Sequence, residues 1–334
     1  MTCAAPTRRS VLAALASTLT TTLPGAPAWA TSASGIFPTR PVRLVVPYSV
    51  GIGPDVVARS VAEHLSQQWG QTVWVDNKPG ASGIVAFGDV RRSAADGYTL
   101  FLADSATLAV NPLLHAHLPY DPLRDLEPLT LLFRATFVLW VGAGNRLRSV
   151  LELQDAARRA PGSISYASLG NGHPSQVSVE SYAHAAGLDL LHVPFKDGGT
   201  LFSAVASGEV DFTTFSINTV AGLMASGRMR PLAVAARERL RSHPLIPTLV
   251  EAGGPPVEMH PWAALMAVAG TPAPVLASLR LGIGQALASD AVLSRAETAG
   301  FEITPSTPQA VRERVAADTA MVGPLIAAGR IARF

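Results

Sequence analysis

The feature that most constrains the fold is a regular alternation of short apolar runs and longer amphipathic stretches. Residues 42–46 read Val-Arg-Leu-Val-Val, a pattern typical of a buried strand. Beyond Asp55, apolar side chains recur every four residues at positions 57, 61, 65 and 69, which predicts one face of a helix that ends at Gly70. Strand and helix units repeated in this way are typical of α/β proteins, in which helices cover a largely parallel sheet.

The alternation continues to the C-terminus and divides the chain into two parts. Further strands are predicted at 73–75, 97–102, 164–168, 192–195, 210–212 and 232–234, and further helices at 150–159, 201–207, 274–288 and 308–328. A length of 334 residues favours two domains. Extended segments near 130–142 and 258–268 suggest two crossings between them. We therefore predict a lobe 1 made of residues 31–135 plus 262–334 and a lobe 2 made of residues 136–261.

The first thirty residues are typical of an export signal. Arg8 and Arg9 precede a short apolar run at 11–16, and Ala28-Trp29-Ala30 fits an A-x-A cleavage site. The arginine pair suggests the twin-arginine export route. The apolar run is far shorter than the roughly 20 residues that a membrane span needs. We predict a signal peptide cleaved after Ala30 and a protein located in the periplasm.

The cysteine count and the net charge exclude several classes of function. The only cysteine, Cys3, lies in the predicted signal peptide, so the mature chain is expected to have no disulfide, thiol nucleophile or cysteine metal ligand. Loss of Arg8 and Arg9 reduces the lysine and arginine count from 26 to 24, against 24 acidic residues. A neutral mature chain has no electrostatic footprint for nucleic acid or an anionic membrane.

The turn at residues 51–55, G-I-G-P-D, joins the first predicted strand to the first predicted helix, where many proteins hold an anion. Val56 stands where a dinucleotide fingerprint has its third glycine, and Pro54 lacks an N–H donor, so a dinucleotide site is disfavoured. Two alternatives remain. One is a tight turn without ligand, and the other is a small-anion site built from the N–H groups of residues 51–53. Asp55 is predicted to cap the helix.

A second glycine-rich turn, at residues 168–173, follows another predicted strand. Ser168 lacks the G-x-S-x-G context of a nucleophile, and His173 fits a capping or surface role better than a catalytic base. His115 and His117 lack the acidic or cysteine neighbours of a metal site. Lys196 fits a solvated turn near the cleft. We therefore expect no enzyme activity, no metal and no cofactor.

Several short motifs follow one another in a fixed order across the mature chain. They include P-V-R-L-V-V-P-Y (41–48), V-D-N-K-P-G-A-S-G (75–83), D-G-Y-T-L (96–100), Y-A-S-L-G-N-G (166–172), H-V-P-F-K (192–196), G-E-V-D (208–211) and P-T-L-V-E-A-G (247–253). Each motif alone is weak, whereas the ordered set is specific. The set resembles the periplasmic solute-binding proteins of tripartite tricarboxylate transporters, the Bug-type receptor family.

The resemblance implies a two-lobe periplasmic-binding-protein fold of the Venus-flytrap, type II-like kind, with the ligand between the lobes. Family members mostly bind small carboxylates through backbone N–H groups, hydroxyls and ordered water. Carried over by position, the expected lobe 1 contacts are Tyr48, Val50, Gly51, Ile52, Gly53, Ala103, Asp104, Ser105, Ala106 and Thr107. The expected lobe 2 contacts are Ser168, Gly170, Asn171, Phe195, Lys196 and Asp197.

The sequence departs from the family pattern at positions that bear on the ligand. Val50 and Ile52 replace a proline and a glycine of the first loop, and Asp197 replaces a glycine. Asp104 alters a loop that is usually rich in threonine, and Phe215 stands where many members have aspartate. Apolar bulk together with added negative charge favours a ligand with an apolar or aromatic body, or one that carries an amine, over a simple dicarboxylate.

These features predict an extracytoplasmic, monomeric receptor for a small carboxylate or related organic anion. Its expected partners are the organic acid and the membrane permease subunits of a tripartite tricarboxylate transporter. Binding works because a ligand that touches both lobes favours the closed state. Two alternatives stay open: a periplasmic sensor that signals to a partner protein, and a cleft hydrolase, for which the sequence offers no activated nucleophile.

Overall fold

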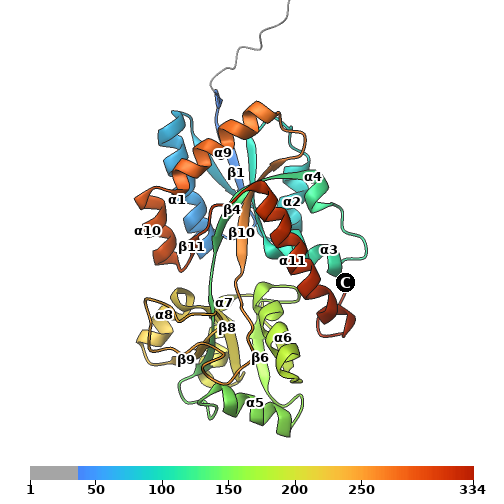
Figure 1. The fold of residues 1–334 in the computed structure, drawn as a ribbon, viewed down its shortest axis with the longest axis vertical. Helices are drawn as coiled ribbons and strands as arrows, with labels where there is room; N and C mark the ends of the chain where they lie inside the picture. The colour runs from blue at the N-terminus through green and yellow to red at the C-terminus, as the bar shows by residue number, and fades with distance from the viewer. Residues whose placement is uncertain (1–36) are drawn as a thin grey trace, which may run out of the picture. The chain divides into compact units, whose positions relative to one another are not determined.

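Two β-sheets organise the chain (Figure 1). The computed structural model describes residues 37–334, so the predicted signal peptide and its cleavage site after Ala30 lie outside the described residues. The first sheet has the strand order β11-β4-β10-β3-β1-β2. Its strands are β1 (Val42–Val46), β2 (Val73–Asn77), β3 (Thr99–Asp104), β4 (Leu126–Arg134), β10 (Trp262–Val268) and β11 (Glu302–Ile303).

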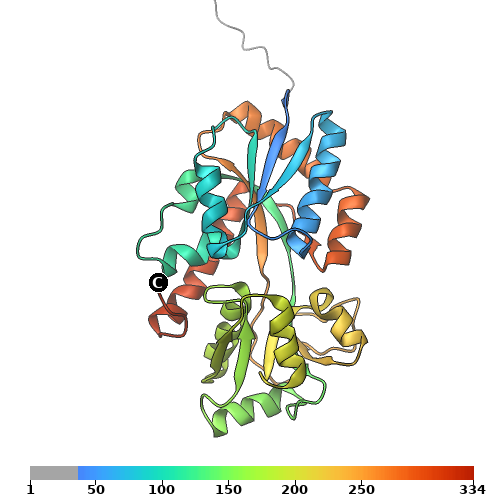
Figure 2. The same cartoon turned by 180° about the vertical axis from the view of Figure 1, so that it is seen from behind.

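Helices cover both faces of the first sheet, and with it they form what we call the first lobe. On one face lie α1 (Gly53–Trp69), α9 (Ala273–Leu287) and α10 (Asp290–Ala299). On the other face lie α2 (Ile84–Arg91), α4 (Pro122–Asp125) and α11 (Pro308–Ala327). Figures 1 and 2 show this arrangement from opposite sides. Strand side chains alternate between the two cores: Leu44 belongs to the first and Val45 to the second. Burial on both faces explains the nearly continuous apolar runs of these strands.

The second sheet, with its helices, forms the second lobe. Its strand order is β7-β6-β8-β5-β9, from β5 (Phe137–Gly142), β6 (Ser165–Ser168), β7 (Leu191–Pro194), β8 (Phe212–Ser216) and β9 (Met229–Val234). One core holds α5 (Val150–Arg159) and α6 (Pro174–Ala186), and the other holds α7 (Gly198–Ser207) and α8 (Ile217–Ala225). Neighbouring residues of β5 again face opposite cores, Leu139 the first and Trp140 the second.

Two extended segments connect the lobes. The segment predicted near 130–142 is two strands, β4 and β5, which belong to different sheets and are separated by Ala135 and Thr136. The return segment precedes β10. The two segments are hydrogen-bonded to each other, because Ala135 N donates to Pro261 O (2.8 Å) and Phe137 N donates to Met259 O (3.0 Å).

The C-terminal helix also joins the lobes. α11 packs against β4 and α6, and its last turns share an apolar cluster with α3 (Asn111–Leu114) and α6 that contains Leu114, Val177 and Val322. Within residues 37–334, no helix is both long enough and apolar enough to cross a membrane.

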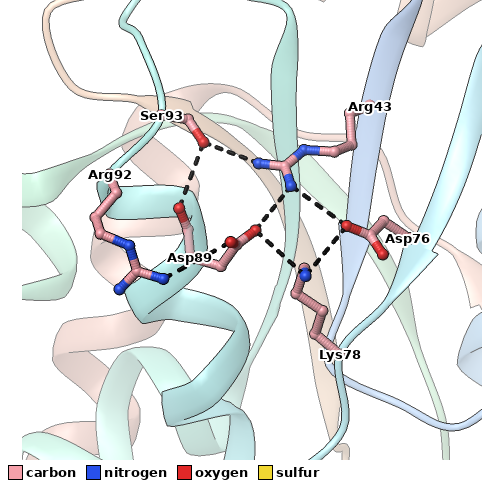
Figure 3. A network of polar contacts seen from close by, with 6 residues as sticks. All are labelled: Arg43, Asp76, Lys78, Asp89, Arg92 and Ser93. Atoms are coloured by element: carbon pink, nitrogen blue, oxygen red, sulfur yellow. Dashed lines mark hydrogen bonds and ion pairs between the residues drawn. The ribbon is translucent and has the colours of Figure 1, made fainter.

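An ionic network holds the N-terminal strands to α2 (Figure 3). Arg43 of β1 donates to Asp89 of α2 (2.8 Å) and to Asp76 of β2 (3.3 Å), and Lys78 lies 3.5 Å from Asp76 and 3.8 Å from Asp89. Lys78 belongs to the D-N-K-P-G motif, and Asn77 in the same motif donates to Tyr48 O (2.9 Å). The motif therefore fixes the loop that follows β1 at Tyr48.

Candidate functional site

A cavity of about 320 Å³ is lined by residues from both lobes. Its volume falls within the range of about 300–1,000 Å³ that is usual for small-molecule sites. The first lobe contributes Tyr48, Ile52, Gly53, Pro54, Asp104 and Trp262, and the second contributes Leu169, His173, Gly198, Phe202, Ser216 and Thr219. The connecting segments add Ala135, Phe137 and Pro261. A ligand here would touch both lobes at once.

Aromatic side chains form most of the cavity wall. Phe215 contacts Phe137 and Phe202, with ring centroids 5.8 and 4.9 Å apart, and on the first-lobe side Phe133 contacts Phe301 at 4.3 Å. Ile52 adds a branched aliphatic side chain at a position where it is 44% exposed. The wall is therefore suited to an apolar or flat ligand body.

Four helices begin at this cavity. The lining includes Gly53 at the start of α1, Pro174 at the start of α6, Gly198 at the start of α7, and Ser216, the N-cap of α8. The first-turn N–H groups of a helix have no intrahelical acceptor, and the helix dipole places partial positive charge there. Converging helix starts therefore favour an anion without needing a lysine or arginine.

Gly53 is required by packing rather than by its backbone angles. A Cβ atom at this position would lie 2.6 Å from Cε2 of Phe301, much closer than a carbon contact allows. The glycine thus lets the start of α1 approach the aromatic wall of the cavity.

Two expectations about the 51–55 turn are wrong. The N-cap of α1 is Ile52, and no side chain caps this end; Asp55 lies within the first helical turn and is fully buried. Its carboxylate accepts a hydrogen bond from Gly51 N (2.8 Å). The N–H group of Gly51, which was expected to face a ligand, is therefore already paired within the protein. Burial alone would raise the pKa of Asp55, but hydrogen bonds from Arg59, Asn77 and Gly51 lower it overall, so the carboxylate is charged.

Asp104 supplies a negative charge to the cavity. It is only 8% exposed, and its Oδ1 accepts hydrogen bonds from Thr107 N (2.8 Å) and Thr107 Oγ1 (2.6 Å). Its Oδ2 accepts a hydrogen bond from the Tyr48 hydroxyl. Burial, followed by the charge of Asp104, raises the pKa of Tyr48 well above its ordinary value, so the phenol stays protonated. Among the described residues that line the cavity, none is a lysine or arginine.

His173 is the N-cap of α6, consistent with the capping role predicted for it. Its Nδ1 accepts a hydrogen bond from Ser175 N (3.1 Å). Burial lowers the pKa of His173 to about 4, although the charge of Asp104 acts in the opposite direction. The imidazole is therefore neutral at pH 7 and does not balance the charge of Asp104.

Of the residues predicted to bind ligand, only Tyr48, Ile52, Gly53 and Asp104 line this cavity. Thr107 lies behind Asp104, which it orients, and Ser105 lines a separate cavity of about 50 Å³. The other first-lobe residues outside the lining are Val50, which is largely exposed, Gly51, Ala103 and Ala106.

The predicted second-lobe residues are engaged elsewhere. Ser168 is fully buried and its hydroxyl lies 2.6 Å from His192 Nε2, while Gly170 N donates to Ser168 Oγ (3.1 Å). Asn171 donates to Ala332 O (2.7 Å), and Asp197 caps α7 through Thr200 N (2.9 Å). Phe195 lines a different surface hollow and Lys196 is exposed. Contact of these residues with a ligand stays a prediction.

Sequence reasoning did not identify Phe202, Ser216 and Thr219 as candidate site residues. The available signal was the junction of β8 and α8 at Ser216, a third strand-to-helix turn of the same kind as those at residues 51 and 168. His115 and His117 lie on a loop where His115 stacks on Phe334, and no group of three potential metal-binding side chains occurs within the described part of the chain.

Comparison with known proteins places the chain among transport receptors. Residues 57–330 match the tripartite tricarboxylate transporter family receptor (TctC). Protein BugT of Bordetella pertussis is 32% identical over 84% of this chain and 86% of its own length. The structure of R. palustris Rpa4515 with adipate is 31% identical, with a TM-score of 0.80 over 89% of this chain and 100% of the other.

A second solved structure, MatC from Rhodopseudomonas palustris with bound malate, is 27% identical, with a TM-score of 0.76 over 87% of this chain and 100% of the other. These similarities confirm both the predicted α/β fold of two lobes and the predicted family. The family match begins at the fifth residue of α1 and ends just after α11. It includes all the residues that line the cavity except Tyr48, Ile52, Gly53 and Pro54. The chain belongs to the tripartite tricarboxylate transporter receptor family.

Proposed function

We propose that the protein is a periplasmic receptor that binds a small organic carboxylate in the cavity between the lobes and delivers it to the permease subunits of a tripartite tricarboxylate transporter. The observation that carries this proposal is the convergence of four helix starts, those of α1, α6, α7 and α8, on one cavity. Helix starts stabilise an anion through their dipoles, and no side chain caps the first-turn N–H groups of α1 or α8. Adipate and malate in the related solved structures are both carboxylates.

The proposal includes the parts of the chain that frame the cavity. Residues 31–135 plus 262–334 form lobe 1 and residues 136–261 form lobe 2, and residues 1–30 are a twin-arginine signal peptide that is removed after Ala30. The mature protein acts as a monomer and binds its ligand without transforming it. Of the residues predicted from sequence, Tyr48, Ile52, Gly53 and Asp104 contact the ligand directly.

Adding a negative charge at one helix start tests this proposal. Ser216 is the N-cap of α8, lines the cavity and is 5% exposed. Aspartate is as good an N-cap as serine, so Ser216→Asp should fold, yet it places a carboxylate where the ligand carboxylate would lie. Like charges about 4 Å apart repel by several kcal/mol at an effective dielectric constant of 20. We therefore expect at least a tenfold loss of affinity for whichever carboxylate the wild type binds.

Two matched variants serve as controls. Ser216→Asn has nearly the same shape without the charge and should retain most of the affinity. Ser289→Asp makes the same change at the N-cap of α10, outside the cavity, and should bind like the wild type. Binding would be measured by calorimetry with a panel of dicarboxylates, aromatic acids and amino acids. Equal affinities of Ser216→Asp and Ser216→Asn would show that the ligand carboxylate does not lie at these helix starts.

A further inference from the structure

Asp104 lines the cavity without a charged side-chain partner among the described residues. Its carboxylate accepts hydrogen bonds from three donors, Thr107 N, Thr107 Oγ1 and the Tyr48 hydroxyl, and all three are neutral. No ion pair within the described chain includes Asp104. Buried charges in proteins are usually paired, whereas this carboxylate is 8% exposed and has no ion-pair partner among the described residues.

The unbalanced charge faces the cavity and has room for one more partner. An ionised carboxylate offers about four acceptor positions, of which three are occupied here. Asp104 lines a cavity whose other walls are aromatic rings and helix starts. Neighbouring Asp55, by contrast, has its charge matched by Arg59, whose Nε lies 2.9 Å from its Oδ2.

We propose that Asp104 binds a protonated nitrogen of the ligand, so that the ligand is a small amino carboxylate with an apolar or aromatic body. This inference rests on the proposed function, because it assumes that the ligand carboxylate lies at the helix starts. The ammonium group supplies the missing counter-charge and donates to the free acceptor position of Asp104. The body of the ligand lies against Phe133, Phe215 and Trp262. In this arrangement the helix starts bind the carboxylate of the ligand, Asp104 binds its ammonium group, and the aromatic wall contacts its apolar body.

The arrangement also explains how the site would reject simple dicarboxylates. A second carboxylate at the Asp104 end would meet a like charge in a partly desolvated space, which costs several kcal/mol. Apolar acids without an amine would avoid this repulsion but would leave Asp104 without a counter-charge. Asp104 is therefore a specificity-determining residue for the nitrogen of the ligand.

Matched ligand pairs test the inference. Phenylalanine and 3-phenylpropanoate, leucine and 4-methylpentanoate, and tryptophan and 3-indolepropanoate differ only in the α-amino group. We expect the wild type to bind at least one amine-bearing member at least tenfold more tightly than its partner. Asp104→Asn keeps the shape of the side chain and an acceptor for Thr107, and it should reduce this preference at least fivefold. Asp155→Asn, the same change at an exposed site on α5, should leave the preference unchanged.

The possible outcomes are separable. If the wild type prefers the deaminated members, binds only dicarboxylates, or retains its amine preference in Asp104→Asn, the role of Asp104 is overturned while the carboxylate receptor stands. If no carboxylate of any kind binds to folded protein, the proposed function itself fails. Circular dichroism and thermal melting first establish that each variant folds. If Asp104→Asn does not fold, Asp104→Glu is used in its place. The longer side chain of Asp104→Glu keeps the charge but moves it, and the same loss of amine preference is expected.

Discussion

Partly buried histidines are expected to make the stability of this protein sensitive to acid. Burial lowers the pKa of His173 to about 4, and it also lowers the pKa values of His192 and His260. In the unfolded chain a histidine has a pKa of about 6.5. Between about pH 6.5 and 4 the unfolded state therefore binds more protons than the folded state, so the free energy of unfolding decreases as the pH falls. The stability that comes from keeping these histidines neutral is therefore fully present above about pH 6.5 and decreases below it.

His173 offers a direct test of this dependence. His173→Asn retains a side-chain acceptor for Ser175 N at the N-cap of α6 but cannot titrate. Urea unfolding of the wild type at pH 7.5, 6.0 and 5.0 should show a decline that is steeper than that of the variant. The difference between their slopes should not exceed about 1.4 kcal/mol per pH unit, the limit for one proton. Parallel curves would mean that burial does not keep His173 neutral.

At the residue scale, the sequence identified part of the cavity lining, and ligand contact by the other predicted residues stays a prediction. Ile52 and Asp104 stood out because they depart from the family pattern, and both line the cavity. Ser168 was predicted to contact the ligand, yet its hydroxyl pairs with His192, 24 residues away on the neighbouring strand. A strand residue faces one side or the other according to register, and register with a distant strand is not visible in a local motif.

The start of α1 illustrates how an element is fixed by distant partners. Asp55 Oδ2 accepts from Gly51 N (2.8 Å) and Arg59 Nε (2.9 Å), while Oδ1 accepts from Asn77 Nδ2 (2.7 Å). Asp55→Ala would leave these three donors without an acceptor where the buried carboxylate had been. We expect a loss of about 3 kcal/mol in the free energy of unfolding. Ligand affinity should fall as well, because the turn that carries Ile52 loses its anchor.

Asp290→Ala is the matched control for this change. Asp290 also lies in the first turn of a helix, α10, but it is exposed, so its loss should change stability by no more than about 0.5 kcal/mol. Denaturant unfolding of both variants gives the comparison. Similar midpoints for the two variants would contradict the anchoring role of Asp55.

At the element scale, strongly patterned segments were predicted well and short apolar helices were not. β1 at Val42–Val46 and α5 at Val150–Arg159 have the predicted bounds. α2, α8 and α10 were not predicted; α2 and α8 are short and mostly apolar, so they show little of the polar and apolar alternation that marks a surface helix. The segment near 130–142 was predicted as one extended crossing, and the structure divides it into β4 and β5, because apolar periodicity does not mark the point where the chain leaves one sheet for the other.

At the scale of the whole molecule, the sequence predicted that the chain crosses twice between two lobes but not which side chains join the lobes. Asn218 Nδ2, at the start of α8, donates to Glu297 O (2.8 Å) and Thr298 O (2.9 Å) at the end of α10. A Cβ atom on Gly300 would lie only 2.8 Å from Cβ of Asn218, so the glycine permits this close approach. These contacts join residues about 80 positions apart, which no local pattern reveals.

Asn218 is expected to stabilise the closed arrangement of the lobes. If the ligand binds between the lobes as proposed, contacts that hold the lobes together add to its apparent affinity. Asn218→Ala removes two hydrogen bonds, worth about 1 kcal/mol each, and should weaken ligand binding roughly three- to thirtyfold. Small-angle X-ray scattering should show a larger radius of gyration for this variant than for the wild type.

Asn145→Ala is the matched control, because it removes a comparable hydrogen bond to Asp211 O (2.9 Å) inside the second lobe. It should lower thermal stability without changing the radius of gyration, and equal affinity and scattering for the two variants would exclude Asn218 from the closure equilibrium.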